Sequence, residues 1–160
     1  MLRPYQQAAH DAAISWVKKS IDPGLIEAET GSGKSHMIAA AAETFHAISG
    51  KHVLCTAPTV DLVLQNREKF LATGNKASIF SSSIETSLRY PVVFGTPLSI
   101  KNQLKRFGSK FGLIVIDEAH GITPTIKHII NDLREKNDRL RVLGLSATPY
   151  RLGSGLIYAT

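Results

Sequence analysis

Cysteine and long apolar runs are the scarcest features of this 160-residue sequence. Because Cys55 is the only cysteine, a disulfide framework is excluded, and its apolar surroundings predict a buried, unreactive thiol. No apolar run approaches the roughly 20 residues that span a bilayer, and the N-terminus lacks the apolar region of a secretory signal. We therefore expect a cytoplasmic protein without a membrane partner.

Acidic residues are also in short supply, since 13 Asp and Glu residues face 19 Lys and Arg residues, which gives a net charge of +6. Such a balance suits an anionic partner, and nucleic acid is the first candidate. Aromatic residues make up only 7% of the chain, so aromatic side chains are sparse among the basic ones. The length and the 43% hydrophobic content fit one ordinary globular domain.

A glycine-rich turn at residues 25–35 joins a short apolar strand to a run of good helix formers. Gly31 and Gly33 would let successive N–H groups surround an anion, and the helix N-terminus would add its positive end. Lys34, which we expect in a surface loop, would reach the β- and γ-phosphates, and the Ser35 hydroxyl would bind Mg²⁺. The alternative is an ordinary turn with a solvated lysine.

A second group of polar residues follows the most hydrophobic run of the sequence. Residues 113–116 are all apolar and lead into Asp117 and Glu118. A carboxylate at the end of a buried strand beside the first strand can hold Mg²⁺ directly or through water, so we assign this role to Asp117. Glu118 would polarise the attacking water. The alternative is an acidic turn that caps the next helix.

Strand-length apolar runs alternate with helical periodicity along the whole chain. We expect helices near residues 4–20, 34–49, 59–70, 97–107 and 122–135, and strands near residues 24–26, 52–57, 77–80, 91–94, 112–117 and 141–146. The strands are continuous apolar runs, which is typical of a parallel sheet covered on both faces. The predicted fold class is therefore α/β, with three α/β/α layers and a mainly parallel central sheet.

Several short motifs occur in an order that identifies a family. Asp-Glu-Ala-His at 117–120, Ser-Ala-Thr at 146–148 and the loop at 28–35 together resemble the N-terminal RecA-like lobe of a superfamily 2 helicase of the DEAH kind. An alanine at position 28 is common there in place of the first loop glycine. Residues 3–6, 57–65 and 95–97 resemble the glutamine motif, motif Ia and motif Ib. Residues 143–152 are similar to the branch that holds RadD and the Res subunits of type III restriction enzymes.

This resemblance implies roles for the matching residues. ATP and Mg²⁺ would be the cofactors, with catalysis resting on Lys34, Asp117 and Glu118. Gln6 would read the adenine edge with Arg3 nearby, unless Gln6 is an ordinary exposed helix residue. The phosphates would lie on Thr30, Gly31, Ser32, Gly33, Lys34 and Ser35. Coupling between the γ-phosphate and nucleic acid would pass through His120, Ser146 and Thr148.

The same resemblance implies a nucleic-acid face that does not depend on base sequence. Its residues would be Pro58, Thr59, Gln65, Thr96 and Pro97, which would contact phosphates. Lys101, followed by Lys105, Arg106 and Lys110, would extend that face electrostatically. The alternative for these four cations is a solvated helix face.

The leading hypothesis is the ATP-binding lobe of a nucleic-acid-dependent ATPase that translocates on, unwinds or remodels DNA, and the motor part of a restriction complex is an alternative. A nucleotide-dependent binding module without turnover is the second hypothesis, and Glu118 argues against it. A small-molecule kinase is the third. The chain ends in an apolar stretch at residues 153–160, so we expect a longer protein with a second RecA-like lobe. Residues 1–160 alone would then bind ATP but hydrolyse it barely above background.

Overall fold

The structure is a computed structural model that describes residues 2–27, 32–118, 122–146 and 156–159. Its helices are α1 (Pro4–Lys19), α2 (Ser32–Ser49), α3 (Val60–Leu71), α4 (Pro97–Asn102) and α5 (Pro124–Lys136), with a 3₁₀ helix η1 (Leu104–Arg106). Its strands are β1 (Gly24–Glu27), β2 (His52–Thr56), β3 (Ser78–Ser81), β4 (Glu85–Thr86), β5 (Val92–Gly95), β6 (Phe111–Asp117), β7 (Arg141–Ser146) and β8 (Leu156–Ala159).

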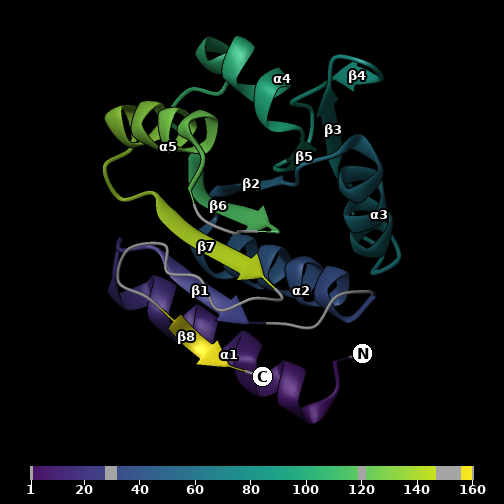
Figure 1. The fold of residues 1–160 in the computed structure, drawn as a ribbon, viewed down its shortest axis with the longest axis vertical. Coiled ribbons are helices and arrows are strands. Elements are labelled where there is room, and N and C mark those ends of the chain that lie inside the picture. The colour runs from purple at the N-terminus through teal and green to yellow at the C-terminus, as the bar shows by residue number, and fades with distance from the viewer. Residues whose placement is uncertain (1, 28–31, 119–121, 147–155, 160) are drawn as a thin grey trace.

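The described strands form one eight-stranded sheet in the order β4-β3-β5-β2-β6-β7-β1-β8. Every neighbouring pair is parallel except β3 and β4. The predicted three-layer α/β fold with a mainly parallel sheet is therefore confirmed (Figure 1).

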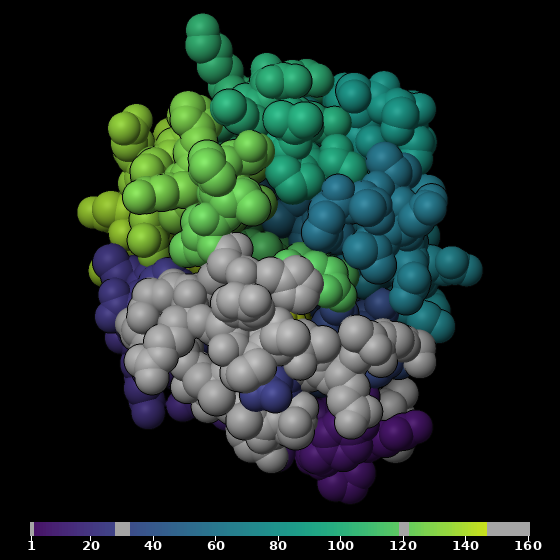
Figure 2. Space-filling view, in the orientation of Figure 1, coloured from purple at the N-terminus to yellow at the C-terminus, as the bar shows by residue number. Residues whose placement is uncertain are grey.

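Alternate residues of the central strands belong to two separate apolar clusters, one on each face of the sheet. In β6, Leu113 and Val115 pack against α1, α2 and α3, whereas Ile114 and Ile116 pack against α4 and α5. Both faces of β6 are buried because helices cover both, which explains its unbroken apolar run. In the space-filling view, α4 and α5 form the upper part of the surface and α3 the right side (Figure 2).

Two local features follow from glycine. Gly50 ends α2 with φ of 71° and donates its N–H to the His46 carbonyl at 2.9 Å, as expected for a glycine after a helix. At Gly95 an added Cβ would lie 2.6 Å from the Phe80 carbonyl oxygen, so only glycine lets β5 approach β3 this closely.

The structure corrects three expectations. The helix predicted at 97–107 is interrupted, because Gln103 leaves helical geometry (φ −134°, ψ 33°) and η1 then brings the Phe107 ring to 4.9 Å from that of Phe80. The strands β4 and β8 were not predicted. Strand β7 lies between β1 and β6, so the prediction that the strand carrying Asp117 lies beside the first strand is wrong.

The environment of Cys55 can be compared with the expectation from the sequence. Cys55 is buried in β2, and burial with the nearby Asp117 charge raises the pKa of its thiol. The prediction that this thiol is buried is confirmed, and a thiol with a raised pKa forms the reactive thiolate less readily. None of the described helices combines the length and apolar character that a bilayer crossing requires.

Candidate nucleotide site

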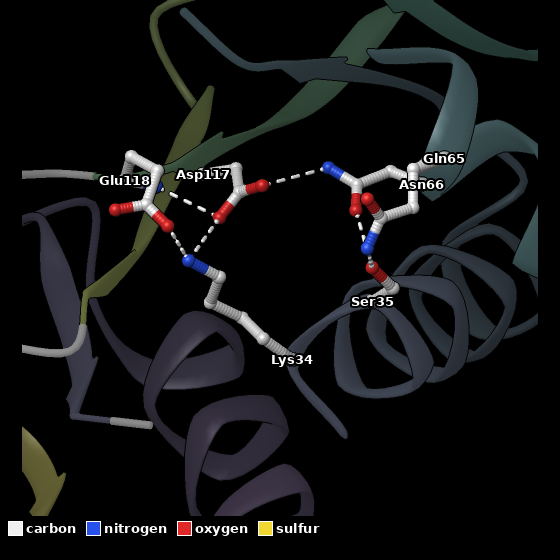
Figure 3. Close-up of polar contacts among 6 residues, drawn as sticks. All are labelled: Lys34, Ser35, Gln65, Asn66, Asp117 and Glu118. Carbon is white, nitrogen blue, oxygen red and sulfur yellow. Dashed lines mark hydrogen bonds and ion pairs between the residues drawn. The ribbon is translucent and has the colours of Figure 1, made fainter. Parts of the chain in front are cut away.

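The candidate site lies at the edge of the sheet where the parallel strands end. Helix α2 follows β1, and Asp117 is the last residue of β6. In open parallel sheets this carboxyl edge is where ligands bind, because the loops that follow the strands converge there. Although β7 separates β1 from β6, the first turn of α2 reaches across to Asp117 (Figure 3).

Lys34 lies in the first turn of α2 and is only 4% exposed, so the expectation of a surface loop is wrong. Its Nζ atom is 3.0 Å from Asp117 Oδ1 and also donates to Glu118 Oε1. A buried ammonium is costly unless it is paired, and the two carboxylates provide that pairing. Lys34 thus stands between both acidic residues of the site (Figure 3).

Both carboxylate oxygens of Asp117 accept hydrogen bonds, and the next residue, Glu118, has a positive φ angle. Asp117 Oδ1 also accepts the Glu118 N–H at 2.8 Å, and Oδ2 accepts from Asn66 Nδ2 at 2.8 Å. Glu118 has φ of 56°, the left-handed region that a residue other than glycine seldom occupies. Such backbone conformations concentrate at active sites, where the surrounding contacts maintain them.

Ser35 connects α2 to α3. Its hydroxyl donates to Asn66 Oδ1 at 2.7 Å, and Gln65 Nε2 lies 3.5 Å from Ser35 Oγ. Sequence reasoning missed Asn66. The signal was present, since Asn66 shares the buried stripe of α3 with Val63 and Phe70, where an apolar residue is the usual choice.

The side chains present fit Mg²⁺ better than a metal that needs a complete protein cage. Among the described residues, no group of three or more His, Cys, Asp or Glu side chains could hold a metal. Ser35 and Asp117 instead offer one hydroxyl and one carboxylate, linked through Asn66. Mg²⁺ is commonly bound by one or two protein oxygens together with phosphate oxygens and water.

Gln6 packs against the start of α2. It is 6% exposed, which excludes the alternative of an ordinary exposed helix residue. Its Oε1 accepts the Arg3 N–H at 2.9 Å, and its Nε2 would lie 2.6 Å from a Cβ added at Gly33. A glycine at 33 therefore lets the Gln6 amide touch the backbone of the loop-to-helix junction.

The candidate nucleic-acid residues lie at the same edge, after β2 and β5, which are neighbours in the sheet. Pro58 and Thr59 are exposed, and Thr59 caps α3 by accepting the Leu62 N–H at 3.2 Å. Thr96 and Pro97 begin α4. Lys101 and Gln65, both exposed, complete this set, and the Gln65 amide is directed to Ser35.

One of the four cations has a different task. Arg106 donates to the Thr86 hydroxyl at 3.1 Å and to the Thr86 carbonyl at 2.8 Å, so it fastens β4 to η1. Its guanidinium also lies 5.1 Å from the centre of the Phe80 ring. These contacts occupy the side chain, so we remove Arg106 from the proposed extension of the nucleic-acid face.

Some predicted residues fall outside the described ranges or are only partly described. Thr30, Gly31, His120 and Thr148 lie outside them. Ser32 is the first residue of α2. Ser146 is fully buried at the end of β7, opposite Glu27 of β1. Of the three residues predicted to couple the two sites, only Ser146 lies in the described ranges, at the same edge as Asp117, and the coupling role stays a prediction.

Comparison with known proteins extends this description. Residues 1–151 match the family described as type III restriction enzyme, res subunit. The ATP-dependent DNA helicase Mph1 of Sclerotinia sclerotiorum is 29% identical over 143 residues, which cover 78% of this chain and 11% of that protein.

Two solved helicase structures share the fold. The Hef helicase domain of Pyrococcus furiosus superposes with a TM-score of 0.78 at 25% identity, covering 98% of this chain and 37% of that one. The UvsW helicase of bacteriophage T4 superposes with a TM-score of 0.71 at 25% identity, covering 92% and 52%. The chain thus spans about a tenth of the curated relative and about half or less of these solved chains. With the match extending over residues 1–151, the chain belongs to the family of type III restriction enzyme res subunits, within the superfamily 2 helicases that the sequence motifs indicated.

Proposed function

We propose that this chain is the ATP- and Mg²⁺-binding lobe of a nucleic-acid-dependent ATPase that translocates on or remodels DNA. The observation that carries the proposal is the contact of Lys34 with Asp117 and Glu118 at the carboxyl edge of a helicase-like sheet. A lysine, a hydroxyl and two adjacent carboxylates are the groups that phosphoryl transfer needs.

Each side chain has a separate task in this proposal. Lys34 exchanges its carboxylate partners for the terminal phosphates, and its ammonium then offsets their charge. Ser35 and Asp117 supply the protein oxygens for Mg²⁺, which when bound would neutralise charge on the β- and γ-phosphates. Glu118, released from Lys34, accepts a proton from the attacking water. Gln6 contacts the adenine, and the backbone from Thr30 to Gly33 contacts the phosphates.

DNA is the proposed nucleic-acid partner. The relative Mph1 is named as a DNA helicase, and the family name points to a restriction enzyme. The net charge of +6 suits a polyanion. Pro58, Thr59, Thr96 and Pro97 follow β2 and β5, so contacts to DNA phosphates there would be made at the same edge of the sheet as the proposed ATP site. A motor within a restriction complex is the second candidate, and the family match favours it.

Efficient hydrolysis would require a second RecA-like lobe. The matched solved chains are about two to three times as long as the part that this chain covers. An arginine supplied from outside a nucleotide lobe is worth roughly 10³ to 10⁵ in rate in related enzymes. We therefore propose that residues 1–160 bind Mg²⁺–ATP but turn it over only slightly above background, with little stimulation by DNA.

The test is calorimetric titration of the 160-residue chain with Mg²⁺–ADP and with a non-hydrolysable ATP analogue. Lys34→Ala should weaken binding at least about 100-fold, because the ammonium is lost from the phosphates. Lys101→Ala, an exposed lysine on α4, is the matched control and should bind as the wild type does. Equal affinity of Lys34→Ala and wild type would remove the phosphate-site proposal.

Turnover is tested separately. Steady-state ATPase is measured for the 160-residue chain and for a longer chain that continues past Thr160, each with and without single-stranded and duplex DNA. Glu118→Gln versions detect a contaminating ATPase. Strong DNA-stimulated turnover by the 160-residue chain, lost in Glu118→Gln, would show that no second lobe is needed.

A further inference from the structure

Asn66 is a buried amide for which the proposed function has no task. It is 3% exposed and lies in α3 between Val63 and Phe70 on the face that packs into the core. An amide in such a place is costly unless its polar atoms are hydrogen-bonded. The contacts of Asn66 therefore need an explanation of their own.

Both ends of the Asn66 amide are used, and each contacts a proposed magnesium ligand. Oδ1 accepts the Ser35 hydroxyl at 2.7 Å, and Nδ2 donates to Asp117 Oδ2 at 2.8 Å (Figure 3). The two partners come from α2 and β6, so the single side chain joins three elements. The Asp117 carboxylate fixes the orientation of the amide, because a carboxylate accepts hydrogen bonds and therefore requires the Nδ2 end. The Oδ1 end then faces Ser35, whose hydroxyl can donate to it.

The direction of these bonds determines which lone pairs remain. By accepting the hydroxyl hydrogen, Asn66 leaves the lone pairs of Ser35 Oγ for other partners, one of which is the Gln65 amide at 3.5 Å. By donating to Oδ2, it holds the Asp117 carboxylate so that Oδ1 faces Lys34 at 3.0 Å. Asp117 Oδ1 is thereby directed to Lys34, where the phosphates are proposed to bind, and the Ser35 hydroxyl is held by α3 with its oxygen available as an acceptor.

We propose that Asn66 is a positioning residue for Mg²⁺: it orients Ser35 and Asp117 from the side of α3 without contacting the metal itself. This inference rests on the proposed function, because it assumes that Mg²⁺–nucleotide binds at these two residues. Partners that orient metal ligands from behind typically change metal affinity 10- to 100-fold when they are removed. The effect of Asn66 should accordingly appear in the dependence on Mg²⁺ and not in the binding of metal-free nucleotide.

The experiment is a calorimetric titration with ADP over a series of Mg²⁺ concentrations and in the presence of EDTA. In Asn66→Leu, which keeps a side chain branched at Cγ but removes the amide, the Mg²⁺ concentration at half-maximal effect should rise about tenfold or more. Affinity in EDTA should stay within about twofold of wild type, and Asn131→Leu, on the exposed surface of α5, is the matched control. An unchanged Mg²⁺ midpoint, or an equal loss of affinity with and without Mg²⁺, would overturn the inference.

A second variant covers the case in which Asn66→Leu does not fold, as judged by its thermal unfolding. Asn66→Ser keeps a polar side chain but is too short to join both ligands, so it should show the same rise in the Mg²⁺ midpoint. Lys34→Ala is titrated alongside. If Lys34→Ala binds ADP as tightly as wild type, the proposed function fails; if only the Asn66 variants keep the wild-type Mg²⁺ midpoint, the role of Asn66 alone fails.

Discussion

The two faces of the sheet are covered alike by helices but carry different side chains. On the face of α1, α2 and α3, the buried polar residues of the helices are Gln6, His10, Lys34, Ser35 and Asn66. On the other face, the corresponding residues of α4 and α5 in the described structure include only Ser99, and α5 packs through four apolar residues, Ile126, Ile129, Ile130 and Leu133. The helices of the first face thus bury polar side chains, several of them at the candidate nucleotide site, whereas the helices of the second face pack on the sheet almost entirely through apolar side chains.

The largest expected effect tests the second face. Ile129 is fully buried in α5, so Ile129→Ala should lower the free energy of unfolding by about 2–5 kcal/mol. Nucleotide affinity of the folded fraction should not change, because α5 lies across the sheet from Lys34. Urea unfolding and calorimetry measure the two quantities. Ile122→Ala, at an exposed position, is the control, and a loss below about 1 kcal/mol at Ile129 would contradict the assignment.

The next effect tests the first face at Gln6. Gln6→Ala should reduce the preference for ATP over GTP about tenfold, a change of about 1.4 kcal/mol, because the amide is proposed to contact the base. Stability should also fall by about 1 kcal/mol, since Oε1 accepts the Arg3 N–H. Gln7→Ala, at the exposed neighbouring position, is the control in titrations with both nucleotides. Equal weakening of ATP and GTP would exclude the adenine role.

A matched pair of helix caps sharpens the comparison further. Thr59 accepts the Leu62 N–H at the start of α3, and Thr123 accepts the Ile126 N–H at the start of α5, both at 3.2 Å. Thr59→Ala and Thr123→Ala should each lower stability by about 1 kcal/mol. Only Thr59→Ala should weaken binding of single-stranded DNA, measured by fluorescence anisotropy at low salt. Equal DNA affinities in the two variants would remove Thr59 from the nucleic-acid face.

The smallest effect concerns the opposite edge of the sheet. Burial, with the charges of Lys110 and His46, lowers the pKa of His52 from its ordinary value of 6.5, and its ring lies edge-on to Phe111 at 5.5 Å. The unfolded chain therefore binds the proton more readily than the folded chain does. The contribution of the neutral His52 ring to folding stability is complete above pH 6.5 and is lost as the pH falls below this value. His52→Gln should make the fall in melting temperature between pH 7.5 and 5.5 smaller than in the wild type. An unchanged fall, compared with the exposed control His128→Gln, would contradict this assignment.

Much of the fold could be predicted from the sequence because periodicity is a local property. The predicted strand at 141–146 coincides with β7, and the helix predicted to begin near Pro4 is α1. The exceptions have non-local causes. Helix α4 stops early because Phe107 joins the rings of Phe80 and Phe111, which are distant in the sequence. Strand β4 has two residues and no apolar pattern of its own, so only its pairing with β3 defines it.

For the candidate site, the sequence by itself determined the chemical groups, because Gly-Lys-Ser after one strand and Asp-Glu after another are local patterns with a known use. Only the tertiary structure decided how these groups meet. The insertion of β7 between β1 and β6, the burial of Lys34 between two carboxylates and the link from Ser35 through Asn66 to Asp117 all depend on strand order and helix packing. Contacts between residues more than 30 positions apart arise from the packing of whole elements, and no local pattern specifies that packing.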